Sequence, residues 1–219
     1  MRAFLIAILV CASLFGADAD ARAKGHPPAS VAGKFDYYLL TLSWSPSYCE
    51  GHPQDMQQCG TQRSGFVLHG LWPQYRAGGF PENCPTRNRL DGGAQSVGAN
   101  VFPSSKLIAH EWDRHGTCSG LTAKGYFELA DQAHQSIVIP DQFQPGDGVA
   151  ILTSTQIAQA FRDANARLSD QSMAVICSGP ELTEIRVCLT KTLEPTACGA
   201  DVHSVCRSSP VRASGAAAR

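Results

Sequence analysis

The sequence has almost no imbalance of charge. Its 219 residues carry 18 Lys and Arg against 19 Asp and Glu, a formal net charge of −1 at pH 7. A protein that coats a polyanion relies on many phosphate contacts from an extended basic surface. The balance therefore argues against such a passive coating protein, but it is compatible with an enzyme that has a small, local basic site.

Long apolar runs are also missing, apart from one at the start of the chain. Residues 3–15 are almost purely apolar, follow Arg2, and precede small residues suited to cleavage after Ala19 or Ala23. The alternative is an uncleaved anchor, but about 13 apolar residues are too few for a membrane span of roughly 20. We expect a signal peptide over residues 1–23, cleaved after Ala23, and export to the periplasm or the outside of the cell.

The chain has no internal repeat and no sign of a second domain. Removal of the signal peptide leaves a length that fits one domain with a sizeable core. We place this domain at residues 24–207 and expect a disordered tail at 208–219.

Hydrophobic patterns predict strands, then helices, then strands again. Pro73 should end the second strand soon after His69, and a stretch rich in Gly, Pro and Asn at 81–102 should be loop. This order predicts an α+β fold with a central, mainly antiparallel sheet flanked by helices. The expected strands are 35–44, 66–68, 173–177 and 182–189, and the expected helices are 106–115, 123–137 and 154–168.

Cysteine is plentiful, with nine residues in the chain. The signal peptide would take Cys11 with it and leave eight. An even number in an exported chain indicates about four disulfides and an oxidising compartment. The number of possible pairings is large, so the spacing alone selects none of them.

Three of the seven histidines fall in two short segments that each contain a Trp. One segment holds His69 and Trp72, and the other holds His110, Glu111 and His115. Imidazole is the only side chain whose unperturbed pKa, about 6.5, lets it exchange protons near neutral pH. The clustering therefore predicts a proton-transfer site.

Residues four apart share one face of a helix. Glu111 and His115 form such a pair, and His110 and Arg114 form another, so the helix can present an acid, a base and two cationic groups. A solvated helix face is the simpler explanation for Glu111 or Arg114 alone. Together with His69, the group indicates a functional site.

The helix lacks the H-E-x-x-H spacing of zinc proteases, in which the two imidazoles lie one turn apart. His110 and His115 are five positions apart. At ~3.6 residues per turn, their side chains should diverge by roughly 140°. Two rings placed in this way do not easily chelate one ion, so we expect no metal at this site.

The two segments resemble the active-site motifs of the ribonuclease T2 family. The matching motifs are H-G-L-W-P at 69–73, H-E-W at 110–112 and H-G-T-C at 115–118. The resemblance extends to the exported precursor, the aromatic strand before the first motif and the four late cysteines. It implies an endoribonuclease that cleaves single-stranded RNA, and not DNA, by transesterification through a 2′,3′-cyclic phosphate. It implies no cofactor, and we expect a monomer.

The resemblance also implies a role for each residue. His115 would be the general base and His69 the general acid, because the reaction needs one imidazole of each kind. Glu111 and Arg114 would flank the transition state, and His110 would help to hold the phosphate. Arg114 departs from the commonest family pattern, which has Lys at this position.

Three further residues concern the base of the substrate. Trp72 has the place of a residue that stacks on the base, although a core Trp after a strand is the alternative. Gln74 stands where some family members carry an Asp that reads an exocyclic amine, so low base specificity is implied. Tyr75 is either a further substrate contact or a loop aromatic.

The cysteine pairing is implied by the same resemblance. The expected disulfides are Cys49–Cys59, Cys84–Cys118, Cys177–Cys206 and Cys188–Cys198. Two other classes of protein are the alternatives. An inactive RNA-binding module should lack one of His69, Glu111 or His115, and all three are present. A metal-dependent hydrolase would stop working in a chelator.

Overall fold

The computed structural model describes residues 30–60, 65–207 and 209–217. The expected signal peptide lies outside these residues. Within the described ranges, no helix combines the length and the apolarity that a membrane span requires.

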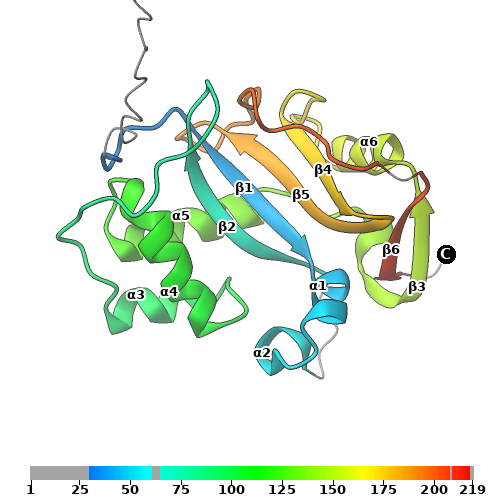
Figure 1. Ribbon diagram of the computed structural model, residues 1–219, viewed down its shortest axis with the longest axis horizontal. Helices are drawn as coiled ribbons and strands as arrows, with labels where there is room; N and C mark the ends of the chain where they lie inside the picture. The colour runs from blue at the N-terminus through cyan, green and yellow to red at the C-terminus, as the bar shows by residue number, and fades with distance from the viewer. Residues whose placement is uncertain (1–29, 61–64, 208, 218–219) are drawn as a thin grey trace, which may run out of the picture.

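One six-stranded sheet forms the centre of the described structure (Figure 1). Its strands are β1 Tyr37–Trp44, β2 Phe66–Gln74, β3 Pro145–Leu152, β4 Met173–Ser178, β5 Glu181–Leu189 and β6 Val211–Ala216. They follow the order β2-β1-β5-β6-β3, and β4 also pairs with β5. Their pairings are antiparallel except for a short parallel contact between β5 and β6. The predicted α+β fold with a mainly antiparallel sheet is therefore confirmed.

Helices flank the sheet at both ends. Among the described residues they are α1 Ser45–Gly51, α2 Met56–Cys59, α3 Gly92–Gly98, α4 Ser105–Arg114, α5 Ala123–Gln135 and α6 Ser154–Ala164, with 3-10 turns η1 Gly116–Cys118 and η2 Asp141–Phe143. In Figure 1, α3, α4 and α5 gather beside β2, whereas α6 lies at the other end near β4. The site is formed where α4 meets β2.

Alternation along β1 gives the sheet one apolar face and one more polar face, which also holds a small buried cluster around Leu39. Leu40 and Leu42 join the main core, together with Phe127 of α5 and Phe161 of α6, and all four are fully buried. On the opposite face the register places Thr41 beside Arg186. The apolar face stabilises the domain, which leaves the polar face free to carry charged side chains.

Two predicted boundaries are wrong for identifiable reasons. Pro73 does not end β2, because it pairs with Tyr38 and the strand continues to Gln74. The strand β2 lies at an edge of the sheet, where a residue without an N–H is tolerated. At the other end, α6 stops at Ala164, since the Asn165 side chain donates a 2.8 Å hydrogen bond to the carbonyl of Phe161.

The prediction of a disordered tail at 208–219 is wrong for residues 211–216. These residues form β6, which pairs with β3. Neither strand has a strong local signal, because both contain Gly and small residues, and each depends on the other for its hydrogen bonds. Similarly, α3 lies inside the predicted loop, where Asp91 caps it by accepting a 2.8 Å hydrogen bond from the amide of Ala94.

Candidate active site

His69 is the extra residue of a β-bulge in β2. Thr41 of β1 pairs with Gly70 and Leu42 pairs with Leu68, so His69 has no partner in this ladder. A bulge re-aims a side chain and is common next to active sites. Here the imidazole Nδ1 lies 3.0 Å from Oε1 of Glu184, on the polar face of the sheet.

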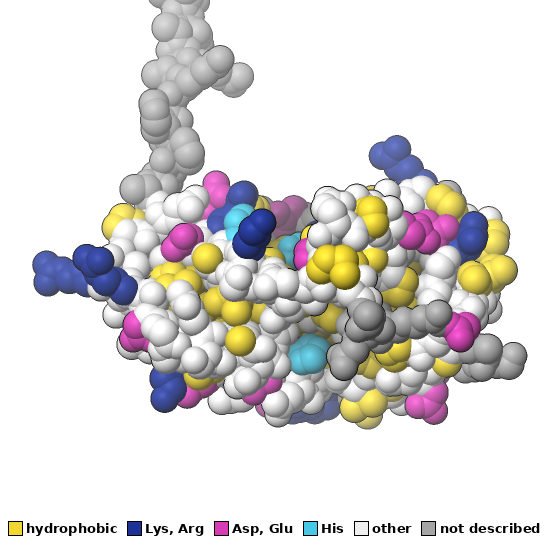
Figure 2. Space-filling view, turned by 90° about the horizontal axis from the view of Figure 1, so that it is seen from below, with side chains coloured by type: hydrophobic (Ala, Val, Ile, Leu, Met, Phe, Trp, Pro, Cys, Tyr) yellow, Lys and Arg dark blue, Asp and Glu magenta, His cyan; other side chains and the backbone are white. Residues whose placement is uncertain are grey.

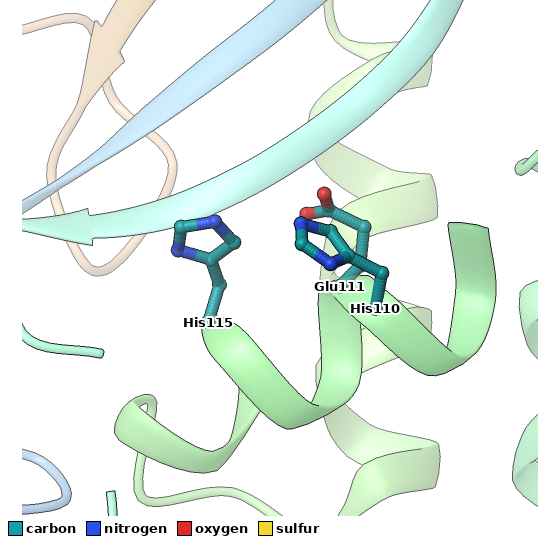
Figure 3. A group of neighbouring side chains, drawn as sticks. All are labelled: His110, Glu111 and His115. Atoms are coloured by element: carbon teal, nitrogen blue, oxygen red, sulfur yellow. The ribbon is translucent and has the colours of Figure 1, made fainter. Parts of the chain in front are cut away.

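Helix α4 supplies three more of the predicted residues. Ser104 caps the helix by accepting a 3.2 Å hydrogen bond from the amide of Leu107. His115 is the residue after the last turn, with φ −115° and ψ −48°. The side chains of His110, Glu111 and His115 all lie on the side of α4 that faces strand β2 (Figure 3).

Glu111 is joined to β2 through Trp72. Its carboxyl group is completely buried, and its Oε2 accepts a 2.7 Å hydrogen bond from the indole Nε1. This bond requires glycine at position 70, because a Cβ there would lie 2.0 Å from Trp72 Nε1 and 2.2 Å from Glu111 Oε2. The motif H-G-L-W therefore links the bulge to the acid on α4.

The environment of Glu111 favours its neutral form. Burial raises the pKa of this carboxyl to about 7, against the opposing effects of the His69 charge and the Trp72 hydrogen bond. Its second oxygen, Oε1, has no hydrogen-bond partner among the described residues. A protonated Glu111 can therefore offer a hydrogen bond from Oε1.

The two histidines differ in charge. Burial would lower the pKa of His69, but the hydrogen bond to Glu184 and the negative charges of Glu111 and Glu184 outweigh it, so the pKa is raised. His115 is only 4% exposed, and burial together with the positive charges of Arg114, His110 and His69 lowers its pKa to about 3. The surroundings therefore favour the charged form of His69 and the neutral form of His115.

Trp72 lies between the two histidines. Its ring stacks on His115, with centroids 5.0 Å apart and planes 25° apart, and meets His69 edge-on, also at 5.0 Å. Phe80, which the sequence did not single out, lies 5.8 Å from the His115 ring and is 40% exposed. An aromatic residue in a Gly-rich loop carries no local signal of such a position.

The cationic residues of α4 lie at the rim of the site. Arg114 forms an ion pair with Glu82, with a distance of 2.8 Å between Nη2 and Oε2, and both side chains are 43% exposed. Its guanidinium also lies 5.7 Å from the ring centre of Phe80. His110 is exposed, and its ring centre is 6.3 Å from that of His115.

Gln74 and Tyr75 are positioned mainly by the fold. Gln74 is only 3% exposed at the end of β2, and Tyr75 packs against the main core. The structure thus brings together His69, Trp72 and the α4 residues, and it leaves these two side chains outside that group of contacts.

His110, Glu111 and His115 are closer together than the helical spacing predicted. One possible ligand atom from each lies within 4.8 Å of the other two. The divergence of roughly 140° assumed a regular helix, but His115 follows the last turn of α4. The expected separation of the rings is therefore wrong, and the three residues could hold a divalent ion once Glu111 has lost its proton.

A cleft of about 760 Å³ opens beside the histidines. His69 and His110 line it, together with Tyr48 and His52 from the α1 region and Lys106 from the first turn of α4. On the molecular face in Figure 2, Lys and Arg are scattered among Asp and Glu along the described surface. This distribution agrees with a local cationic site rather than a broad basic surface.

The structure contains the four disulfides that the resemblance implied, Cys49–Cys59, Cys84–Cys118, Cys177–Cys206 and Cys188–Cys198. The second one lies next to the site. It joins the loop before α3 to η1, and the amide of Asn83 donates a 2.9 Å hydrogen bond to the carbonyl of Arg114. The end of α4 that carries His115 is therefore fastened to the adjacent loop.

Glu184 and Arg186 are site residues that the sequence did not reveal. Arg186 donates two hydrogen bonds to Oε2 of Glu184, at 2.9 Å from Nε and 2.7 Å from Nη2. Their alternation with buried Ile185 and Val187 shows that they share the polar face of β5. No local pattern, however, indicates that Glu184 meets a histidine 115 positions away.

Comparison with known proteins defines the family. Residues 35–198 match the Ribonuclease T2 family, about three quarters of the chain. The motifs that hold His69, Glu111 and His115 lie inside the matched region. The protein therefore belongs to the ribonuclease T2 family.

Individual relatives agree with this assignment. A protein of Aeromonas hydrophila named Ribonuclease is 51% identical over 104 residues, which cover 48% of this chain and 47% of the relative. The chain thus spans about half the length of this and several other curated relatives. Ribonuclease DdI of Dictyostelium discoideum is 26% identical over 215 residues, covering 85% and 87% of the two chains.

A solved structure supports the fold itself. The RNase-related protein from Calystegia sepium superposes with a TM-score of 0.65 at 24% identity, and the match covers 81% of this chain and 96% of that one. At this identity the likeness is evidence for a shared architecture.

Proposed function

We propose that the protein is an exported endoribonuclease that cleaves single-stranded RNA by transesterification through a 2′,3′-cyclic phosphate, without a metal. The observation that carries the proposal is the pair of histidines around Trp72, one with a raised pKa and one with a lowered pKa. Two titratable groups pushed apart in this way fit an acid and a base.

In the proposed reaction, neutral His115 takes the proton from the ribose 2′-OH. The 2′-oxygen forms a bond to phosphorus while the bond from phosphorus to the 5′-oxygen breaks, and charged His69 gives its proton to that leaving oxygen. A base whose pKa is about 3 is weak. The phosphate anion of the substrate would raise this pKa, because it offsets the positive charges that surround His115.

Charge that develops on the phosphoryl oxygens needs donors already in place. Glu111 supports this role through its raised pKa and its unpartnered Oε1, which can donate a hydrogen bond when protonated. His110 and Arg114 would add positive charge from the rim, once Arg114 exchanges Glu82 for the phosphate.

Base recognition is proposed to be weak. Gln74 is buried, so its amide is not presented to the cleft as a reader of base edges. Trp72 remains our proposed stacking residue, although its indole already stacks on His115 and binds Glu111. The exposed Phe80 offers a second aromatic surface beside His115, and stacking of this kind accepts every base.

Export is supported by the four disulfides, which form and persist in oxidising compartments. We propose a periplasmic or extracellular monomer. DNA should not be a substrate, since the nucleophile is the 2′-OH that only RNA possesses.

One assay tests the proposal. Purified protein should digest single-stranded RNA in excess EDTA, His115→Ala should not, and the first product should be a 2′,3′-cyclic phosphate by phosphorus NMR. Single-stranded DNA and 2′-O-methyl RNA should stay intact. Complete loss of activity in EDTA would instead favour a metal-dependent hydrolase that uses the His110, Glu111 and His115 cluster.

A further inference from the structure

Glu184 is placed to control His69. Its Oε1 lies 3.0 Å from Nδ1 of the imidazole, and its Oε2 accepts both hydrogen bonds from Arg186. The Glu184 side chain is 14% exposed, against 35% for His69. The carboxylate therefore lies behind the ring and bridges it to a cation on the same strand.

We propose that Glu184 is a positioning residue that sets both the orientation and the protonation of His69, and that Arg186 holds Glu184 in place. The proposal rests on the proposed function, in which His69 is the general acid. Glu184 does not need to touch the substrate, because it acts through the imidazole.

The hydrogen-bond chemistry determines which nitrogen of His69 can act. A carboxylate only accepts hydrogen bonds, so Nδ1 must carry a proton toward Glu184. The other nitrogen, Nε2, is then the one that can deliver a proton and take it back. A carboxylate behind a histidine fixes its tautomer and stabilises its charged form in the same manner in other enzymes.

Arg186 keeps the carboxylate available for this role. Burial would raise the pKa of Glu184, but the hydrogen bond to His69 and the charge of Arg186 outweigh it, and the pKa is lowered. The two bonds from the guanidinium hold Oε2, which leaves Oε1 directed at His69.

The other charged groups around His69 come from the α4 region and from β5. Glu111 favours the charged imidazole, whereas Arg186 on β5 opposes it, and His69 and His115 repel each other when both are protonated. Among the residues that the structure describes, only Glu184 contacts the ring with a carboxylate at hydrogen-bond distance. Removal of its charge should therefore lower the pKa of His69 and change its tautomer.

The first experiment measures His69 directly by nitrogen and carbon NMR of labelled full-length protein. In the wild type, neutral His69 should carry its proton on Nδ1, and in Glu184→Gln its pKa should fall by about one unit or more. The matched control is Glu181→Gln, because Glu181 lies on the same strand but pairs with Arg212. An unchanged His69 pKa and tautomer in Glu184→Gln would overturn the proposal.

The second experiment separates positioning from structural damage. Glu184→Gln should lose roughly 10- to 10²-fold in kcat on a dinucleotide, by analogy with the loss of a carboxylate that orients a metal-bound histidine. With a 3′-(4-nitrophenyl phosphate) of a nucleoside, whose leaving group needs no proton, the loss should be under about threefold. The alkaline limb of the pH profile on the dinucleotide should also move to lower pH.

The outcomes distinguish this proposal from the proposed function. Equal losses on both substrates with an unmoved alkaline limb would mean that Glu184 is merely structural, and would overturn the inference. A wild-type protein that leaves RNA intact would contradict the proposed function. The NMR measurement would still decide whether Glu184 controls His69.

Discussion

The two candidate catalytic histidines are held by opposite means. His69 lies in a bulge of a strand, has a third of its side chain exposed and contacts a carboxylate. His115 follows a helix, is almost fully buried, and its Nδ1 has no hydrogen-bond partner in the described part of the chain. The pKa of the same residue type is thereby raised in one place and lowered in the other.

This contrast shows what the surroundings of a histidine contribute. The hydrogen bond to Glu184 and the charges of Glu111 and Glu184 together outweigh the burial of His69. The burial of His115 acts in the same direction as its positive neighbours Arg114 and His110. Trp72 contacts both rings, so the two environments are separated by a single indole. An acid and a base can therefore operate close together at one pH.

Removal of either imidazole gives the largest expected effect. His69→Ala and His115→Ala should each lose at least about 10²-fold in kcat/KM on RNA, the lower bound for general acid–base catalysis. The wild-type pH profile should be bell-shaped, with limbs set by the coupled pair. His69→Ala should lose the alkaline limb and His115→Ala the acidic limb.

A histidine outside the site serves as the control for these two variants. His203 is exposed, so His203→Ala should keep the wild-type rate and profile. A wild-type profile that rises steadily to pH 10 would contradict the assignment of an imidazole base. Loss of the same limb in both variants would show that the two histidines do not have separate roles.

The disulfide beside His115 tests whether its position depends on the adjacent loop. Cys84→Ser with Cys118→Ser should lower the free energy of unfolding by about 2–5 kcal/mol and should reduce activity at temperatures where the fold persists. The control is Cys49→Ser with Cys59→Ser, which opens a bridge of sequence separation 10 instead of 34. Peptide mapping that pairs Cys118 with another cysteine, or an unfolding loss no larger than that of the control, would contradict this expectation.

Glu111 should make stability depend on pH. Its pKa is raised from 4.5 to about 7 in the folded protein, so the folded state binds more protons than the unfolded state between these values. Its contribution to stability is therefore fully present below pH 4.5 and is lost as the pH rises to about 7, on the order of 3 kcal/mol.

The test compares unfolding in denaturant at pH 5 and pH 8. The free energy of unfolding of Glu111→Gln, relative to that of the wild type, should increase between pH 5 and pH 8. The activity of this variant should fall. Glu128→Gln is the control, because Glu128 is half exposed on α5. His115 changes stability in the opposite sense, below pH 6.5, so the difference between variants isolates Glu111. A pH-independent difference would refute the raised pKa.

Gly70 should be the most sensitive glycine of the site. A methyl group there would overlap Trp72 Nε1 and Glu111 Oε2, so Gly70→Ala should cost about 1–3 kcal/mol of stability and roughly tenfold in kcat. Gly92→Ala is the matched control, since no atom lies near its Cβ position. Wild-type activity in Gly70→Ala, or an unchanged indole N–H signal of Trp72 by NMR, would argue against this role of the hydrogen bond between Trp72 and Glu111.

Local patterns in the sequence were sufficient for most of the fold. The aromatic run of β1, the Ser104 cap of α4 and the stripe of Ile157 and Phe161 on α6 each encode their element without help from distant residues. Strands β3 and β6 have no such pattern, because they depend on pairing with each other and, for β6, with β5. The tail was therefore mistaken for disorder.

The residues of the candidate site differ in the same way, some being marked by local motifs and others depending on distant strands. His69, Glu111 and His115 stand in compact motifs, so the sequence could identify them. The bulge at His69 depends on the register between β1 and β2, and Glu184 depends on the pairing of β1 with β5. Interactions of this range leave no mark on a short window of sequence, which also explains why Phe80 was missed.

Arg114 should give the smallest effect when it is changed conservatively. In the structure its guanidinium pairs with Glu82 at the exposed rim, where an ion pair contributes about 0–1 kcal/mol. If Arg114 only supplies positive charge near the phosphate, Arg114→Lys should keep most of the rate, since an ammonium can reach the same region. Arg114→Ala should lose roughly 10²–10³-fold in kcat, as expected for the removal of one electrostatic donor.

The control is Glu82→Gln, which should not lower kcat, because it releases the guanidinium of Arg114 from its ion pair. If Arg114→Lys is as slow as Arg114→Ala, the planar guanidinium must bind the phosphate through two parallel hydrogen bonds. Positive charge alone would then not explain the role of Arg114.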